Sequence, residues 1–195
     1  MKTKIGVMGS AQGPTMSRND TVMKAQELGK WIAKTECILV NGACPGLPNE
    51  AAIGAKENGG FVLGVSPAFS EKEHVETYKS PENAYDLILY TGMGLMERDI
   101  LNIRSSDAVI LVGGGVGTLN EFTVAYDEGK IVGVLVGTGG ISDKIPEVLE
   151  MCHREMGDRI IFDKDPRKLV EKIVLAVKEM PRVIYEDERV THGKF

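Results

Sequence analysis

The sequence contains few cysteines, and none lies in a pattern typical of a disulfide or zinc site. Cys37, Cys44 and Cys152 are the only three in a chain of 195 residues. Their odd number and the lack of a Cys-x-x-Cys pair argue against a disulfide framework and against a zinc knuckle. We therefore expect reduced thiols and a cytoplasmic protein.

Long hydrophobic runs are also missing. The longest uncharged stretch, residues 108–120, contains four glycines and is shorter than the ~20 apolar residues of a membrane-spanning helix. At the N-terminus, Lys2 and Lys4 lead directly into a short apolar run at 5–8, without the hydrophobic segment or small-residue cleavage site of a signal peptide. We expect neither membrane association nor export.

No run of basic residues interrupts the mildly acidic charge balance. The chain has 23 Lys and Arg against 28 Asp and Glu, a formal net charge of −5, which disfavours a general nucleic-acid-binding surface. Hydrophobic residues make up 43% and charged residues 26%, proportions that exclude a disordered or collagenous chain. The length favours a single domain, which we place at residues 1–180. Residues 181–195 lack periodicity and are predicted to form a solvated or subunit-contacting tail.

Short apolar runs alternate with segments of helical periodicity along most of the chain. Strands are predicted at 5–8, 38–40, 61–65, 87–90, 108–112, 131–136 and 160–162, and helices at 22–32, 49–56, 95–103, 117–128, 145–156 and 166–180. Asp165 and Pro166 suit the cap and first turn of the last helix. The polar segment between the strands at 61–65 and 87–90, which contains Tyr78, Pro81 and Tyr85, is predicted to be a loop.

This alternation predicts a three-layer α/β fold with a doubly wound, mainly parallel sheet of about seven strands, similar to the Rossmann fold. The uninterrupted apolar run at 108–112 is typical of a parallel strand covered on both faces. In such a sheet the ligand crevice lies outside the carboxyl ends of the strands. The glycine-rich segments fall at those ends.

The most prominent of these segments, residues 113–118, is called the glycine loop below. It reads Gly113-Gly114-Gly115-Val116-Gly117-Thr118, follows the most apolar predicted strand and opens a helix. Backbone N–H groups at a helix N-terminus favour a phosphate, and glycine allows close approach and positive φ. The alternative is a tight strand-to-helix turn without a ligand.

The glycine loop does not match two familiar nucleotide-binding motifs. A P-loop requires a lysine before its Ser or Thr, whereas Thr118 follows Gly117. A dinucleotide fingerprint normally follows the first strand and has an acidic residue about 20 positions later, whereas this loop follows about the fifth strand. Nucleoside triphosphate hydrolysis and NAD binding are therefore disfavoured.

Two charged residues are predicted to lie near the glycine loop. Glu121 follows Thr118 by three positions, which places it on the first turn of the predicted helix; alternatively, it completes a capping box with Thr118. Arg98 belongs to the preceding helix and can face the same crevice; alternatively, it forms a surface ion pair with Glu97 or Asp99. The residues alone leave both alternatives open.

Residues 113–121 resemble the PGGxGTxxE signature of the LOG family, the cytokinin riboside monophosphate phosphoribohydrolases that are often mislabelled lysine decarboxylases. Met96-Glu97-Arg98 is similar to the M-x-R element of that family, and Gly9-Ser10-Ala11 and residues 41–47 are similar to its first two glycine turns. The resemblance covers about residues 4–177. In detail, the chain is closer to a LOG-like branch of Rossmann nucleotide-binding proteins that also resembles the molybdenum-cofactor carrier proteins.

The resemblance implies hydrolysis of the N-glycosidic bond of a nucleoside 5′-monophosphate to free base and ribose 5-phosphate. Glu121 would be the catalytic carboxylate, which stabilises positive charge on the ribose or positions water, and Arg98 would orient the nucleotide and assist departure of the base. The residues expected to bind the phosphate are Gly9, Ser10, Gly114, Gly115, Gly117 and Thr118. The resemblance further implies a homodimer or larger homo-oligomer, and we expect no cofactor and no metal.

The chain departs from the family pattern at several positions. Gly113 replaces the proline of the signature, Val116 its bulky loop residue, and Asp99 the lysine after the arginine, while Pro48 and Asn49 alter the second glycine turn. Two hypotheses follow. The first is the hydrolase, which Glu121 and Arg98 favour. The second is a non-catalytic carrier or binding protein for a phosphorylated, nucleotide-like cofactor such as molybdopterin. Asp99 and Pro48 favour a ligand different from that of the family.

The lysines, the histidines and Cys44 do not indicate a different chemistry. A lysine decarboxylase is excluded because no lysine lies beside a recognisable pyridoxal phosphate site. His74, His153 and His192 are not clustered and are predicted to be solvated or capping residues rather than metal ligands. Cys44 follows a strand near the crevice and is interpreted as a packed cysteine rather than a reactive one.

Overall fold

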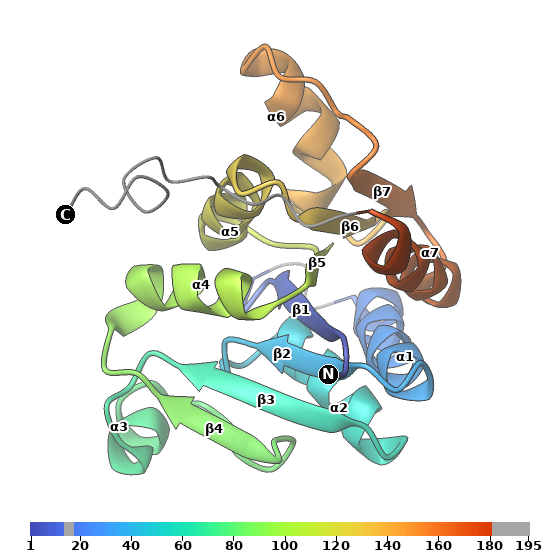
Figure 1. Ribbon diagram of the computed structural model, residues 1–195. Helices are drawn as coiled ribbons and strands as arrows, with labels where there is room; N and C mark the ends of the chain where they lie inside the picture. The colour runs from blue at the N-terminus through green and yellow to red at the C-terminus, as the bar shows by residue number, and fades with distance from the viewer. Residues whose placement is uncertain (14–17, 181–195) are drawn as a thin grey trace, which may run out of the picture.

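Strands and helices alternate throughout the computed structural model, which describes residues 1–13 and 18–180 (Figure 1). The strands are β1 (Lys4–Gly9), β2 (Ile38–Asn41), β3 (Phe61–Ser66), β4 (Leu87–Tyr90), β5 (Ala108–Val112), β6 (Ile131–Leu135) and β7 (Ile160–Asp163). The α-helices are α1 (Asn19–Lys34), α2 (Leu47–Glu57), α3 (Glu71–Glu76), α4 (Gly94–Ser105), α5 (Val116–Asp127), α6 (Ile145–Met151) and α7 (Pro166–Glu179), and a short 3-10 turn, η2 (Ser142–Lys144), precedes α6.

All seven strands pair in parallel in one sheet with the order β4-β3-β2-β1-β5-β6-β7. Helices cover both faces, with α1, α2 and α7 on one side and α4, α5 and α6 on the other (Figure 1). Each face has its own apolar cluster, and β5 contributes alternate side chains to both. The predicted three-layer, doubly wound α/β fold is confirmed.

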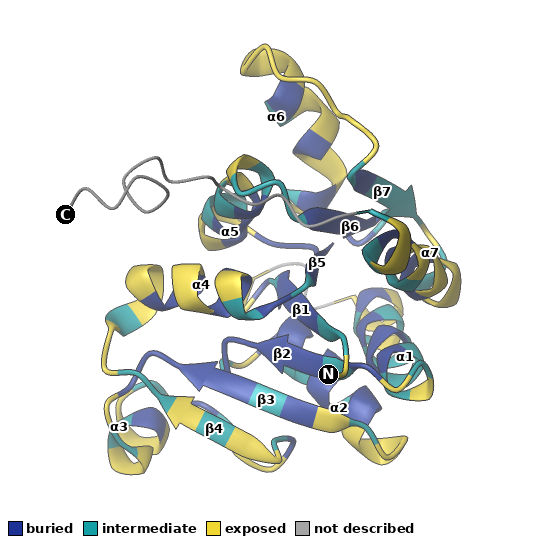
Figure 2. Cartoon of the chain, in the orientation of Figure 1, coloured by how far each residue is buried: buried dark blue, intermediate teal, exposed yellow. Residues whose placement is uncertain are grey.

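The centre of the sheet is buried because its strands are continuously apolar. Every residue of β5 and of β6 is buried, as a parallel strand covered on both faces requires. The edge strand β4 differs, since Leu87 and Leu89 are exposed (Figure 2). The described part of the chain contains no helix long and apolar enough to cross a membrane.

The strand order determines where a ligand can bind. From β1 the chain moves outward through β2 and β3 to β4 and then returns to place β5 on the other side of β1. Loops that leave β1 and β5 therefore diverge at the carboxyl end of the sheet, which is the position of the ligand crevice in doubly wound proteins. The glycine loop directly follows β5.

One helix forms where a polar loop was predicted. The hydroxyl of Ser70 accepts a hydrogen bond from the Glu73 N–H and caps α3. His74 on this helix is fully buried, with Nδ1 2.8 Å from Ser66 Oγ and Nε2 3.1 Å from the Pro81 carbonyl oxygen. The prediction of a solvated or capping His74 is therefore wrong, because the returning chain covers this helix.

At the C-terminal half, most boundaries agree with the predictions. The Asp165 side chain accepts a hydrogen bond from the Lys168 N–H and caps α7, as expected. Helix α6 ends at Met151, earlier than residue 156, and His153 is exposed with φ of 52°. The predicted tail at 181–195, with His192, lies outside the described residues.

Candidate functional site

A cavity of about 350 Å³ opens at the carboxyl ends of β1 and β5. It lies within the size range of small-molecule sites, which starts at roughly 300 Å³. Its walls come from the loops after β1 and β2, the first turn of α2, and the N-terminal halves of α4 and α5. The lining residues are Val7, Gly9, Ser10, Ala11, Gln12, Gly42, Cys44, Pro45, Pro48, Leu95, Met96, Arg98, Asp99, Gly115, Gly117, Thr118 and Glu121.

The structure brings the residues singled out in the sequence together around this cavity. Of the eight predicted site residues, all except Gly114 line it. Gly114 lies behind the cavity wall, with φ of 99°, and a Cβ atom placed on it would come within 2.5 Å of the Thr118 Cβ. Only glycine fits there without strain.

The N-terminus of α5 points backbone donors at one end of the cavity. The helix begins at Val116 after the N-cap residue Gly115. The N–H groups of the first helical residues have no acceptor within a helix, and the positive end of the helix dipole lies at the same place. This arrangement favours an anionic group at Gly115, Gly117 and Thr118.

Other polar groups of the glycine loop hold its shape instead. The Gly114 N–H donates to Ser10 Oγ at 2.7 Å, and the Gly113 N–H donates to Thr138 Oγ1 at 2.9 Å. The Ser142 hydroxyl donates to the Gly113 carbonyl oxygen at 2.7 Å. Thr138 and Ser142 were not predicted as site residues, although the glycine-rich segment around Thr138 marks a second loop at the same edge of the sheet.

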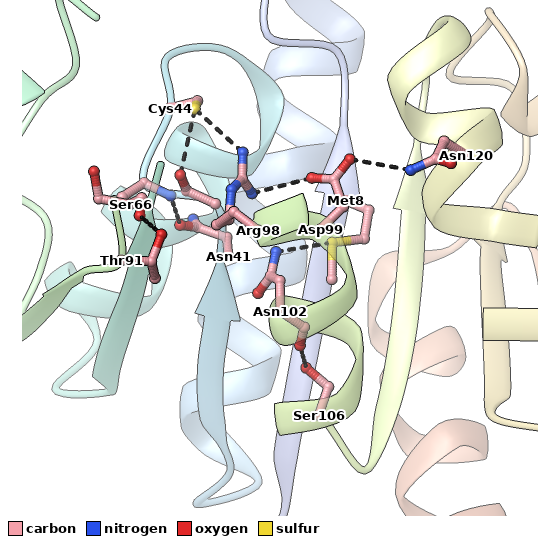
Figure 3. Close-up of polar contacts among 12 residues, drawn as sticks. Met8, Asn41, Cys44, Ser66, Thr91, Arg98, Asp99, Asn102, Ser106 and Asn120 are labelled. Atoms are coloured by element: carbon pink, nitrogen blue, oxygen red, sulfur yellow. Dashed lines mark hydrogen bonds and ion pairs between the residues drawn. The ribbon is translucent and has the colours of Figure 1, made fainter. Parts of the chain in front are cut away.

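Arg98 lies in the cavity wall rather than in a surface ion pair. Its side chain is 6% exposed, and Nη1 lies 3.4 Å from Asp99 Oδ1 (Figure 3). Nη2 donates to Cys44 Sγ at 3.6 Å, while Nε has no partner among the described residues. A Cβ at Gly42 would come within 1.9 Å of Nη1, so glycine there makes room for the guanidinium.

Asp99 is buried beside Arg98 and faces the same cavity. Its Oδ2 accepts a hydrogen bond from Asn120 Nδ2 at 3.3 Å, which links α4 to α5 (Figure 3). Burial raises the pKa of the Asp99 carboxyl, although the Arg98 charge and the Asn120 hydrogen bond act in the opposite direction. The sequence identified this residue only as a departure from the family's lysine.

Glu121 lies on the second turn of α5, and its side chain is buried. Burial raises its pKa to about 8, and the nearby Asp99 carboxylate adds to this effect. The Arg98 charge and a hydrogen bond with Thr118 oppose the rise. The carboxyl is therefore mostly protonated at neutral pH. The capping-box alternative is wrong, because the N-cap residue is Gly115 and Thr118 lies inside the helix.

Cys44 has the surroundings of a packed thiol, as interpreted from the sequence. Its Sγ donates to the Gly42 carbonyl oxygen at 3.3 Å, and burial raises the pKa of the thiol even though Arg98 is close. Thiolates rather than thiols are nucleophilic, so burial disfavours the reactive form of Cys44. Within residues 1–13 and 18–180, no three His, Cys, Asp or Glu side chains lie together as metal ligands would.

The fold and the site together define a Rossmann-like α/β protein with a small-molecule cavity at the switch point of its sheet. Residues 2–170 match the model of the SLOG cluster4 family, and the chain belongs to this family. An uncharacterized protein of Archaeoglobus fulgidus is 34% identical over 132 residues, which cover 68% of this chain and 79% of that protein.

Solved structures of similar proteins support the same relationship. The molybdenum cofactor carrier protein of Chlamydomonas reinhardtii is 30% identical, with a TM-score of 0.72 over 92% of this chain and 100% of that one. The molybdenum cofactor binding protein of Rippkaea orientalis is 27% identical, with a TM-score of 0.72 over 91% and 98% of the two chains. The predicted likeness to LOG-like proteins near the molybdenum-cofactor carriers is confirmed.

Proposed function

We propose that the cavity binds a nucleoside 5′-monophosphate and that the protein hydrolyses its N-glycosidic bond to free base and ribose 5-phosphate. The observation that carries this proposal is the meeting of Glu121 and Arg98 at the wall of one cavity that ends at the N-terminus of α5. A buried, titratable carboxyl beside an anion site is typical of catalytic centres.

The 5′-phosphate is assigned to Gly115, Gly117 and Thr118, where backbone donors and the helix dipole favour an anion. Glu121 follows Thr118 by three residues, about 4.5 Å along the helix axis at 1.5 Å per residue. A phosphate at the helix end therefore leaves the attached ribose beside the Glu121 carboxyl. Binding energy from the phosphate would hold the sugar in this position during the reaction.

In this proposal Glu121 reacts in its ionised form, which the nearby Arg98 charge favours and which a minority of the empty protein holds at neutral pH. When the base leaves, positive charge develops on the ribose, and an anion in a water-poor site stabilises that charge strongly. The bond between C1′ and the base nitrogen breaks with its electron pair passing to the base, water adds to C1′, and the proton that this water loses passes through Glu121 to the base. Arg98 lines the same cavity, and its guanidinium donates to the departing base as negative charge builds there.

A second function is a carrier or binding protein that holds a phosphorylated, nucleotide-like cofactor without turning it over. Its support is the similarity to molybdenum cofactor carrier and binding proteins over more than nine-tenths of the chain. A protonated Glu121 also suits this function, because a neutral carboxyl does not repel an anionic ligand.

One experiment distinguishes the hydrolase from the carrier. The protein is incubated with AMP, GMP, CMP, UMP and isopentenyl-AMP, and free base is measured by chromatography. Glu121→Gln tests the catalytic carboxyl, and Glu97→Gln on the exposed side of α4 serves as a control with the same chemical change. Base release that is abolished only in Glu121→Gln supports the hydrolase. Nucleotides that raise the melting temperature without base release support the carrier instead.

We also propose that the protein associates with a second copy of itself. Large apolar side chains are exposed along the edge strand β4 and along α4, at 38–51% of their surface. They are Leu87, Leu89, Met93, Leu95, Met96, Ile100 and Leu101. Leu95 and Met96 also line the cavity, so a partner on this face would lie at the rim of the site.

A further inference from the structure

The cavity carries an excess of carboxyl groups that an anionic ligand alone does not explain. Arg98 is the only basic side chain among the lining residues, whereas Asp99 and Glu121 are both acidic. The Arg98 charge is directed at Asp99 Oδ1. Because a carboxylate repels phosphate, Asp99 must face a different part of the ligand.

Asp99 has acceptor capacity that its protein contacts do not use. Each carboxylate oxygen can accept about two hydrogen bonds. The contact of Oδ1 with Arg98 is 3.4 Å long and the hydrogen bond from Asn120 to Oδ2 is 3.3 Å long, both longer than a typical charge-assisted bond of about 2.8 Å. Two neighbouring donors on a ligand can therefore bind this carboxylate.

The surroundings of Asp99 suit a flat, aromatic group. Leu95 and Met96 precede it on α4 and are 51% exposed, and Pro45 and Pro48 line the same cavity. These apolar side chains can pack against a planar ring, and the two oxygens of the Asp99 carboxylate can accept hydrogen bonds side by side. A planar ring with two adjacent N–H donors on one edge can make both kinds of contact.

We infer that Asp99 selects a guanine-type base, by accepting hydrogen bonds from the ring N–H and the neighbouring exocyclic amino group. Adenine does not satisfy this arrangement, since its corresponding ring nitrogen is an acceptor that a carboxylate repels. Hypoxanthine keeps the ring N–H but lacks the amino group. This inference rests on the proposed binding of a nucleoside monophosphate, and it names the substrate class.

The test compares the affinities of GMP, IMP and ribose 5-phosphate by calorimetry. A hydrogen bond to a charged group corresponds to a difference of at least about tenfold in Kd, so the wild-type protein is expected to bind GMP at least about tenfold more tightly than IMP. Asp99→Asn keeps the shape but loses the second acceptor, which brings the two affinities together. Glu97→Gln, on the same helix but exposed, keeps the preference.

Ribose 5-phosphate shows whether the phosphate end of the site is intact. Its affinity is expected to be unchanged or higher in Asp99→Asn, because the variant removes a negative charge and no contact to the sugar. Equal affinities for GMP and IMP in the wild type, or a preference that survives in Asp99→Asn, would overturn the inference and leave the proposed function standing. An equal loss of GMP and IMP affinity in Asp99→Asn would also overturn it, because Asp99 would then contact the sugar.

A different result would contradict the proposed function itself. If GMP, IMP and ribose 5-phosphate all fail to bind the wild-type protein, the cavity is not a nucleoside monophosphate site, and the assignment of Asp99 is overturned with it. The two failures are therefore distinguishable from the same set of titrations.

Discussion

At the scale of single residues, the chemistry of the site depends on charged groups that are almost completely buried. Arg98 and Asp99 are each 5% exposed and Glu121 is 8% exposed. Burying an unpaired charge is unfavourable, so the Arg98 and Asp99 charges lie against each other while Glu121 holds a proton. A charged ligand in the cavity would change both the pairing of Arg98 with Asp99 and the protonation of Glu121.

The raised pKa of Glu121 predicts a pH-dependent stability. The folded protein binds this proton more tightly than a carboxyl with the ordinary pKa of 4.5, and the folded pKa is about 8. The contribution of this group to the free energy of unfolding is therefore highest at low pH. It falls as the pH rises from about 4.5 to about 8, by up to about 1.4 kcal/mol per pH unit. We expect Glu121→Gln to melt at a higher temperature than the wild type near pH 8.

Thermal melts of both proteins across this pH range provide the measurement. The difference between the melting temperatures should shrink toward acid, because both side chains are then neutral. Parallel curves for the two proteins would show that burial does not hold a proton on Glu121.

At the scale of elements, one loop supports another. The segment between β6 and α6 supplies Thr138 and Ser142, which bind both backbone polar groups of Gly113. Ser10, after β1, binds the next backbone N–H at Gly114. The glycine loop that leads into α5 is thus held in place by the loops that follow two other strands, β1 and β6.

This support predicts that Thr138→Val impairs phosphate binding. Valine has nearly the same shape but leaves the buried Gly113 N–H without its acceptor, which costs about 1–3 kcal/mol. We expect a lower melting temperature and weaker binding of ribose 5-phosphate, both measured on the purified variant. Thr138→Ser should restore both, because it keeps the hydroxyl.

Thr123→Val is a suitable control for the same substitution. Thr123 is exposed on α5, and its hydroxyl donates to the Asn120 carbonyl oxygen of the same helix. Equal effects of the Thr123 and Thr138 substitutions on ribose 5-phosphate binding would count against a supporting role for the loop after β6.

At the scale of the whole molecule, the sheet leaves one edge apolar. The strand β4 and the helix α4 both carry exposed segments (Figure 2), and several of the exposed residues there are large and apolar. An exposed apolar patch on an edge strand is typical of an interaction surface. The proposed association with a second copy would bury this patch.

Self-association predicts a dimer or larger species in sedimentation experiments at micromolar concentration. Ile100→Glu places a charge on the exposed face of α4, where Ile100 is 38% exposed, and it should shift the protein toward monomer. Leu175→Glu is the matched control, since Leu175 is 54% exposed on α7, at the opposite face of the sheet. A wild-type protein that sediments only as monomer would contradict the proposal.

The sequence by itself determined the order of the strands and of the helices other than α3, the parallel sheet and the place of the glycine loop. Apolar runs, helical spacing and glycine clusters are local signals, and the strand carrying the loop is recognisable because every residue of β5 is apolar. For the same reason Gly115, Gly117, Thr118 and Glu121 could be grouped as a site before the fold was known.

Only the tertiary structure decided how the site residues are paired and charged. The Gly114 N–H is bound by Ser10, 104 positions away, and Arg98 lies against Cys44 rather than water because the loop after β2 folds over α4. His74 is buried by the chain that returns at Pro81. Burial, hydrogen-bond partners and the pKa of Glu121 arise from contacts between distant segments, and no local pattern contains them.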